Sequence, residues 1–155
     1  ETVIQKPFRV VVDYAFTPAA LEKVYQTLKP KEGKIICVLG AAGGGRDRWK
    51  RPVLGKIAAT HCDRVIITNE DPYEEDPEKI VQEVCAGTQG KGEIILDRRE
   101  AIKAALSGAQ PGDAVVITGK GSEDSIAVQG GKRIPWDDRE VVREEMRTMS
   151  MDTKE

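Results

Sequence analysis

Four of the five apolar runs in the sequence end in segments whose residues could bind a small charged molecule. The first run ends at Asp13, and the second leads into the glycine-rich, cationic loop GAAGGGRDRWKRP at residues 40–52. The third is followed by Glu70 and Asp71, and the fifth by GKGSED, which begins at Gly119. Glycines permit close backbone approach to a ligand, and charged side chains beside them supply recognition. These segments predict a binding site built from parts that lie far apart in the chain.

The loop at residues 40–52 favours an anionic ligand. It enters a predicted helix, whose unpaired N–H groups attract anions. Lys50 and Arg51 are candidate anion contacts, together with Lys120 of the last segment. The loop lacks the GxxxxGK[ST] pattern of a Walker loop and the register of a GxGxxG dinucleotide fingerprint. The alternative is a flexible, solvated turn, in which Trp49 would be a helix staple or a core residue.

The acidic segment after the third run contains two kinds of residue. Glu70 and Asp71 lie nearest the strand end and are site candidates, which Glu123 of the last segment could join. Residues 74–76 are expected to favour the next helix, because acids stabilise a helix N-terminus. The DRREAI segment after the fourth run is expected only to cap a helix.

The histidine and cysteine content argues against catalysis in this chain. His61 is the only histidine, and no Ser/His/Asp or Cys/His set forms around it, so we expect a surface or structural role. The three cysteines are widely spaced among aliphatic residues, which is typical of buried, reduced thiols. We therefore expect no catalytic residue and no metal site.

The elements that must position these residues alternate between strand and helix. The apolar runs lie at residues 8–15, 34–40, 64–69, 93–97 and 113–119, and stretches of helical length separate them. This alternation predicts an α/β fold in three layers, with a mostly parallel sheet covered on both faces. N-cap signals predict that helices begin after Thr17, Asp76, Asp97 and Asp137.

The carboxyl ends of parallel strands share one edge of the sheet, so the polar segments should meet there. Near the C-terminus, Gly130 and Gly131 between short alternating runs predict a hairpin or an antiparallel edge strand. A last helix is predicted from Asp137 to Met149, with a frayed tail at residues 148–155.

Length and composition predict one domain over residues 1–155. Because the chain begins with Glu1 rather than Met, we expect a segment of a longer polypeptide. The net charge of -2 from 24 basic and 26 acidic residues gives no field to hold nucleic acid. With no run of about 18 apolar residues and no leader pattern, we expect no membrane partner and a cytoplasmic location.

Five motifs in order resemble one family. VVDYAFTPAALEKV, GGGRDRWKRPVLGKIA, ITNEDPYEEDPEKI, GKGSED and DDREVVREEM together resemble the C-terminal domain of Mur ligases of the MurE type, the UDP-N-acetylmuramoyl-tripeptide synthetases. The resemblance spans roughly Phe8 to Met146. It implies a Rossmann-like third domain behind a UDP-sugar domain and an ATPase domain of the same polypeptide.

In peptidoglycan synthesis, such an enzyme adds the third amino acid to UDP-N-acetylmuramoyl-L-alanyl-D-glutamate through an acyl phosphate. The resemblance implies that ATP and Mg²⁺ are bound mainly outside this domain, which would bind the amino acid and close over ATP. The isolated domain is expected to be inactive.

The resemblance also implies roles for single residues. Arg46 would contact the carboxylate of the incoming amino acid, Gly119 and Glu123 would hold its far end, and Asp13 would face ATP. Tyr73 stands where the family's DNPR segment has arginine, in a stretch that reads Glu70-Asp71-Pro72-Tyr73 here. Tyrosine cannot form the bidentate pair that arginine makes with a distal carboxylate. We therefore expect lysine, or another substrate without a second carboxylate, rather than diaminopimelate.

The sequence differs from the family pattern at two further positions, and two functions other than that of a Mur ligase domain stay open. Phe16 and Ser122 each replace a histidine of the family pattern. The positions of Asp13, Asn69, Glu70 and Lys120 also suggest the acidic pocket of a phosphoacceptor receiver domain, although its paired acids after the first strand are missing. A nucleotide-free interaction module is the third hypothesis.

Overall fold

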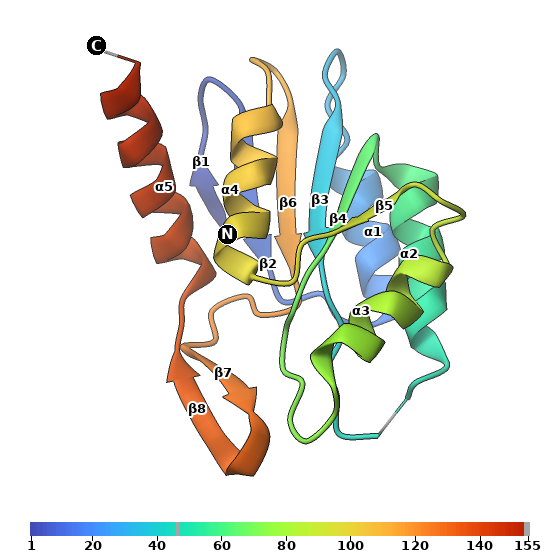
Figure 1. The fold of residues 1–155 in the computed structure, drawn as a ribbon. Coiled ribbons are helices and arrows are strands. Elements are labelled where there is room, and N and C mark those ends of the chain that lie inside the picture. The colour runs from blue at the N-terminus through green and yellow to red at the C-terminus, as the bar shows by residue number, and fades with distance from the viewer. Residues whose placement is uncertain (46, 154–155) are drawn as a thin grey trace.

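The computed structural model describes residues 1–45 and 47–153 and contains a six-stranded sheet (Figure 1). Its strands, in spatial order, are β1 (Thr2–Ile4), β2 (Arg9–Asp13), β6 (Ala114–Thr118), β3 (Ile35–Leu39), β4 (Arg64–Ile67) and β5 (Gly92–Ile94). All neighbours pair in parallel except β1, which runs antiparallel to β2. The predicted α/β fold with a mostly parallel sheet is confirmed.

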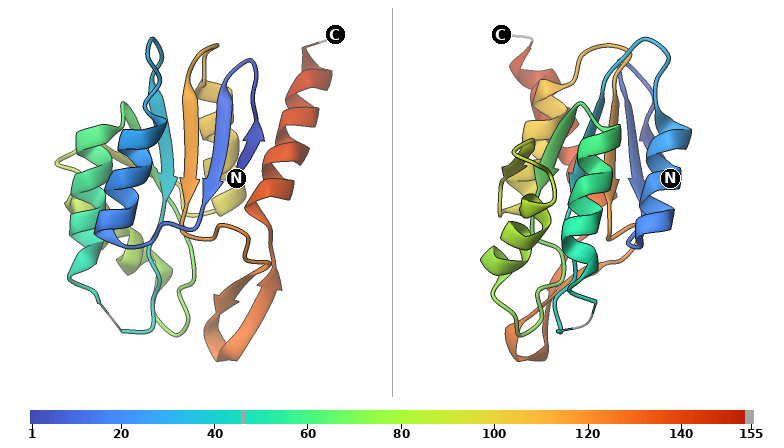
Figure 2. Two further views of the ribbon diagram at one scale, coloured as in Figure 1. Left: turned by 180° about the vertical axis from the view of Figure 1, so that it is seen from behind. Right: turned by 90° about the vertical axis from the view of Figure 1, so that its right-hand side faces the viewer.

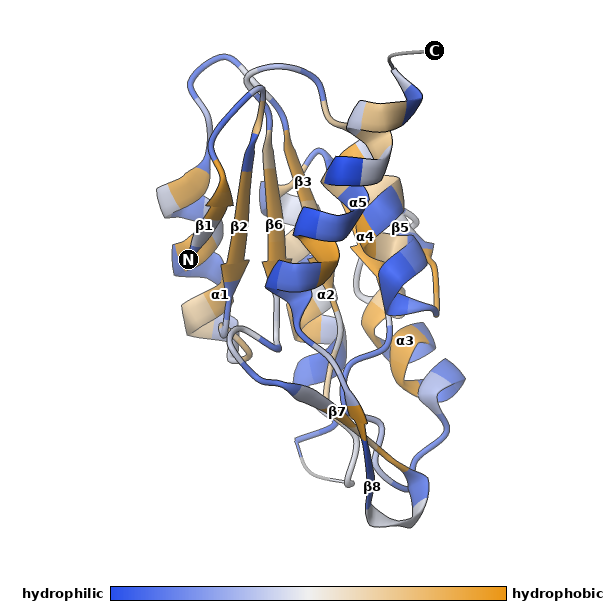
Figure 3. Cartoon of the chain, turned by 90° about the vertical axis from the view of Figure 1, so that its left-hand side faces the viewer, coloured by the Kyte–Doolittle hydropathy of each residue, from blue (hydrophilic) through white to orange (hydrophobic). Residues whose placement is uncertain are grey.

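Helices cover both faces of this sheet. They are α1 (Pro18–Leu28), α2 (Lys50–His61), α3 (Pro77–Ala86), α4 (Arg98–Gly108) and α5 (Asp138–Asp152). The side view of Figure 2 places α1 and α4 on opposite sides of the sheet. One core lies beneath α1, α2 and α3, and a second beneath α4 and α5. The central strands are apolar along their length, whereas the helices show one polar and one apolar side (Figure 3).

The helix starts follow from local side-chain chemistry. The side-chain oxygens of four N-cap residues accept hydrogen bonds from N–H groups two or three positions later: Thr17, Asp76, Asp97 and Asp137. Each bond satisfies a donor that the helix itself leaves unpaired. The predicted starts are therefore confirmed.

The predicted C-terminal hairpin is also confirmed. It consists of β7 (Ser125–Val128) and β8 (Lys132–Pro135), joined by the turn Gln129–Gly131. This hairpin forms its own two-stranded sheet and extends beyond the carboxyl ends of the main strands (Figure 1). The antiparallel edge of the main sheet is instead β1, which the sequence analysis missed because three residues are too short to show a period.

Helix α5 ends at Asp152, three residues beyond the predicted end at Met149, and fraying of the tail at residues 148–155 stays a prediction. Met146 and Met149 of this helix pack against the second core. The predicted tail also included residues 154–155, which lie outside the described residues.

Two of the cysteines, Cys37 and Cys62, are buried, and Cys85 is half-buried, with all three as free thiols, as predicted. Across residues 1–45 and 47–153, no helix combines the length and apolar composition needed to span a membrane.

Candidate functional site

The carboxyl ends of β2, β6, β3 and β4 open into one pocket of about 520 Å³, called here the charged pocket. It is lined by Tyr14, Phe16, Ala42, Gly43, Gly44, Asp47, Lys50, Glu70, Asp71, Tyr73, Gly119 and Glu123. The fold thus brings together residues from segments that are far apart in the sequence. Arg46, which was expected to contact a ligand carboxylate, lies outside the described residues.

The glycine loop is shaped by contact with the segment after β4. The N–H of Gly43 donates to the carbonyl of Asp71 at 2.7 Å, and a Cβ on Gly43 would lie 2.0 Å from the carbonyl oxygen of Pro72. Any larger residue would push these two segments apart. The facing Tyr73 adopts a φ of +51°, which is uncommon outside glycine, and its N–H donates to Ala127 of the hairpin at 3.2 Å. Glycine at position 43 therefore lets the glycine loop pack directly against the backbone of the segment after β4.

The two candidate anion contacts of the glycine loop lie in different environments. Arg51 is 1% exposed and donates to the carboxylates of Glu75 and Glu83, at 3.0 and 2.9 Å. Its charge is compensated inside the protein, and it is not among the residues that line the charged pocket. Lys50 does line the pocket, with its Nζ 3.7 Å from the Asp47 carboxylate. Lys50 is therefore a cation that a ligand can reach.

Lys120, the third candidate anion contact, is fully buried and bound to two acids. Its Nζ lies 2.9 Å from both carboxylate oxygens of Asp71 and 2.5 Å from Glu123. Burial opposes the charge, but hydrogen bonds to Glu123 and Asp71 leave the pKa of Lys120 above its usual value. Asp71 also accepts the N–H of Ala127 at 2.7 Å. Lys120 and Asp71 thus tie the hairpin to the pocket wall.

Glu70 is the acid of the pocket that these contacts leave available. It is 6% exposed, and burial raises its pKa to about 7, although the nearby charge of Arg98 acts against the shift. In the described part of the chain no lysine or arginine is hydrogen-bonded to it, in contrast to Asp71 and Glu123. A Cβ on Gly119, whose φ is +104°, would lie 2.3 Å from the Glu70 carboxylate. Only glycine therefore leaves room for this acid.

Arg98 is the residue that the sequence analysis missed, because DRREAI was interpreted as a plain helix cap. Its guanidinium is buried and forms two hydrogen bonds with Asp138, both of 2.8 Å. The available signal was a cation in the first turn of a helix, where the helix dipole disfavours positive charge. A buried arginine in this position needs a carboxylate from another part of the fold to compensate its charge.

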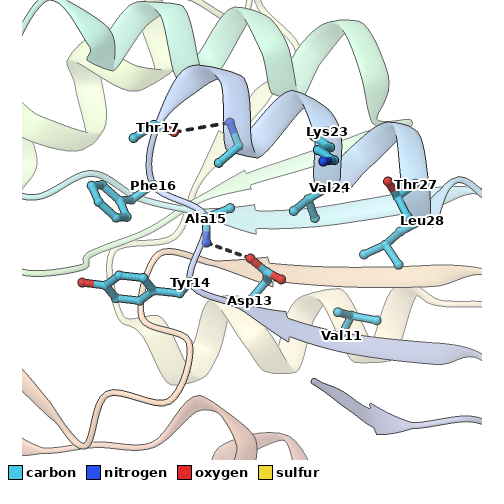
Figure 4. A pocket seen from close by; sticks show the side chains of 11 residues that line it. Val11, Asp13, Tyr14, Ala15, Phe16, Thr17, Lys23, Val24, Thr27 and Leu28 are labelled. Carbon is cyan, nitrogen blue, oxygen red and sulfur yellow. Dashed lines mark hydrogen bonds between the residues drawn. The ribbon is translucent and has the colours of Figure 1, made fainter.

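A second pocket of about 490 Å³ lies between β2 and α1 and is mostly apolar (Figure 4). Asp13 lies at its edge, where the carboxylate accepts the N–H of Ala15 at 2.9 Å. Tyr14 and Phe16 line both this apolar pocket and the charged pocket. The two sites are therefore neighbours along one rim of the domain.

Other residues considered from the sequence lie outside both pockets. His61 ends α2, with its ring nitrogen 3.3 Å from Glu22. Trp49 is 66% exposed, so the interpretation as a core residue is wrong. Among the residues that the structure describes, no group of three or more histidines, cysteines or acids is arranged to hold a metal ion.

The family model that matches this chain and the two similar proteins given below are of one kind, the Mur ligases. The family model described as "Mur ligase, glutamate ligase domain" matches residues 1–121. The chain is 46% identical over 147 residues to UDP-N-acetylmuramoyl-L-alanyl-D-glutamate–2,6-diaminopimelate ligase of Aquifex aeolicus (strain VF5), covering 93% of this chain and 30% of that protein. It is 45% identical over 146 residues to UDP-N-acetylmuramyl-tripeptide synthetase of Roseiflexus sp. (strain RS-1), covering 89% of this chain and 28% of that protein.

A solved structure of a UDP-N-acetylmuramoyl-L-alanyl-D-glutamate–2,6-diaminopimelate ligase superposes with a TM-score of 0.88 at 37% identity. The match covers 97% of this chain and 31% of that structure. The chain thus spans under a third of the length of the proteins that it matches. It belongs to the Mur ligase family, as a C-terminal, glutamate ligase domain of the MurE type.

Proposed function

We propose that this chain is the third domain of an ATP-dependent ligase of peptidoglycan synthesis, which adds an amino acid to UDP-N-acetylmuramoyl-L-alanyl-D-glutamate in the cytoplasm. The names of the relatives and the match over less than a third of their length support this proposal. The upstream UDP-sugar and ATPase domains of the same polypeptide would be its partners. Family membership removes the receiver-domain hypothesis.

In this proposal the charged pocket binds the incoming amino acid. The observation that supports it is the charge distribution: Lys50, which lies 3.7 Å from the Asp47 carboxylate, lines the pocket from the glycine-loop segment, and Glu70 and Glu123 line it from the segments after β4 and β6. Lys120 is shared by two carboxylates, so the acidic side keeps one uncompensated negative charge, and ionised Glu70 adds another. An amino acid has a carboxylate that Lys50 could bind. A second amine at its far end would match the acidic side.

The proposed substrate is therefore lysine, or a similar amino acid without a distal carboxylate. Tyr73 lines the pocket next to the acids and cannot pair with a carboxylate in bidentate fashion. A second carboxylate placed near Glu70 would also meet like charge in a buried setting, which is unfavourable. The diaminopimelate named for two of the matched proteins is a property of those proteins.

The apolar pocket and Asp13 are proposed to face the nucleotide when the domain closes. ATP would supply the phosphoryl group that activates a carboxylate, and most of its contacts, with those to Mg²⁺, would lie in the upstream domain. The role of this chain is then to present the amine and to exclude water on closure. Alone, the domain should neither hydrolyse ATP nor form the amide bond.

Phosphate release by the complete polypeptide tests the proposal. With ATP, Mg²⁺ and the UDP-linked dipeptide, release should depend on added amino acid and should be faster with lysine than with meso-diaminopimelate. Tyr73→Arg should shift the preference toward diaminopimelate, while Trp49→Phe, a matched aromatic change outside the charged pocket, should leave it unchanged. Preference of the unmodified enzyme for diaminopimelate would refute the proposed specificity.

A further inference from the structure

The guanidinium of Arg98 contacts both the start of α5 and the pocket wall. Its Nε and Nη2 each donate to one oxygen of the Asp138 carboxylate at 2.8 Å. The indole N–H of Trp136 donates to the same carboxylate at 2.7 Å. The side chain of Arg98 is 1% exposed and that of Asp138 is fully buried. The pair is therefore held rigidly and shielded from solvent.

The remaining donors of Arg98 reach two strand ends. Nη1 donates to the carbonyl of Asn69 at 3.0 Å, and Nη2 to the carbonyl of Thr118 at 3.1 Å. These carbonyls belong to the residues immediately before Glu70 and Gly119 in the sequence.

Strands β4 and β6 are not neighbours in the sheet, because β3 lies between them. The hydrogen bonds of the sheet therefore do not join their ends to each other directly. The Arg98 guanidinium makes that connection across the end of β3. The spacing matters, since the Glu70 carboxylate fits against Gly119 with no room for a single added carbon.

We propose that Arg98, oriented by Asp138, is a positioning residue that sets the placement of Glu70 against Gly119 and so determines specificity for the far end of the amino acid. This inference rests on the proposed function of the charged pocket. Arg98 touches neither the substrate nor the reacting atoms in this proposal. It acts through the two backbone carbonyls that it binds.

The charge of Arg98 adds a second effect on the same residue. Four charged groups act on Glu70: Arg98 and Lys120 lower its pKa, while Asp71 and Glu123 raise it. Burial has the largest effect and raises the pKa. Without the Arg98 cation, ionised Glu70 should become less favourable, so the amine of the substrate would lose its partner at neutral pH.

Two variants of the complete polypeptide separate positioning from general stability. Arg98→Lys keeps the charge, but a single ammonium cannot bind two carbonyls and a carboxylate in the guanidinium geometry. Arg98→Met combined with Asp138→Asn removes both charges of the buried pair, so neither partner is left as an unpaired ion. Asp113→Asn is the matched control, because its carboxylate binds backbone N–H groups of Lys34 and Gln110 at the opposite end of the sheet.

We expect both Arg98 variants to raise KM for lysine by about tenfold or more, with KM for ATP within about twofold. The pH midpoint of kcat/KM for lysine should move upward in the double variant, and Asp113→Asn should change neither quantity. Equal changes in both KM values, or an unchanged KM for lysine, would overturn the positioning role.

A crystal structure of the Arg98→Lys enzyme provides a readout independent of activity. An altered separation of the Asn69 and Thr118 carbonyls would support the inference, and an unchanged one would contradict it. If the unmodified enzyme shows no lysine-dependent phosphate release, the proposed function fails, while the carbonyl separation still decides whether Arg98 positions this wall.

Discussion

Replacement of Glu70 by glutamine should stabilise the domain at neutral and alkaline pH. Glu70 is 6% exposed, and its pKa rises from 4.5 to about 7 because burial disfavours the charged form. The folded state therefore holds a proton that the unfolded chain releases at lower pH. Between pH 4.5 and 7 the unfolded state binds fewer protons, so stability falls as pH rises through this window. Above pH 7 the full cost remains.

The size of this effect follows from the shift itself. A change of about 2.5 pKa units, at about 1.4 kcal/mol per unit, gives a cost of about 3 kcal/mol for ionised Glu70 at pH 8. Glutamine has nearly the same shape and does not ionise. The Glu70→Gln domain should therefore match the unmodified domain near pH 4.5 and exceed its free energy of unfolding by about 3 kcal/mol at pH 8.

Urea denaturation of the 155-residue chain at several pH values measures this difference. The control is Glu32→Gln, which removes an exposed carboxylate from a turn at the opposite end of the sheet and should leave the pH profile unchanged. The reasoning is refuted if the Glu70→Gln chain shows the same stability difference at pH 5 and pH 8. A lower stability of that variant at pH 8 would refute it as well.

Two other substitutions test the packing of the site. Gly119→Ala should raise KM for lysine in the complete enzyme more than about tenfold, because the new carbon would lie 2.3 Å from Glu70. The control is Gly112→Ala, at a φ of +91° with open space around it, which should leave KM for lysine unchanged. Comparable KM values in the two variants would contradict this. Arg51→Met should lower the free energy of unfolding by about 3 kcal/mol in urea denaturation, because it leaves two carboxylates around a buried site without their cation. Arg99→Met, at a partly exposed arginine, should lower the free energy of unfolding by less than about 1 kcal/mol. A similar loss in the Arg51 and Arg99 variants would argue that burial of Arg51 is not the cause.

The elements of the fold that sequence predicted are those that local chemistry determines. A strand buried on both faces needs a continuous apolar run, so β3 and β6 are recognisable without knowledge of their neighbours. A helix N-cap requires a side-chain oxygen a few residues before the donors it satisfies, as at Asp97. Strand β1 lacks such a signal, because three residues at a sheet edge gain their structure from pairing with β2.

The candidate site was predictable only at the level of segments. Parallel topology implied that the residues after β2, β3, β4 and β6 would meet, and the charged pocket is lined from all four. Whether a charged side chain is paired within the protein or left for a ligand depends on residues that are far away in the sequence. Asp71 was predicted as a ligand-binding acid, and in the structure both of its carboxylate oxygens also accept hydrogen bonds from Lys120, 49 positions later. Arg98 looked like a capping residue, but its partner Asp138 is 40 positions away.

The glycine loop shows why the two sides of the pocket act as one unit. Gly43 is hydrogen-bonded to the backbone of Asp71, and Glu75 accepts the N–H of Gly45 while also binding Arg51. The loop that carries Lys50 is thus fastened at several points to the segment that carries the acids. The separation between the basic and acidic sides is then set by the protein before a ligand binds. If the charged pocket binds an amino acid as proposed, a fixed separation of this kind would select ligands by length as well as by charge, because a shorter diamine could not reach both sides at once.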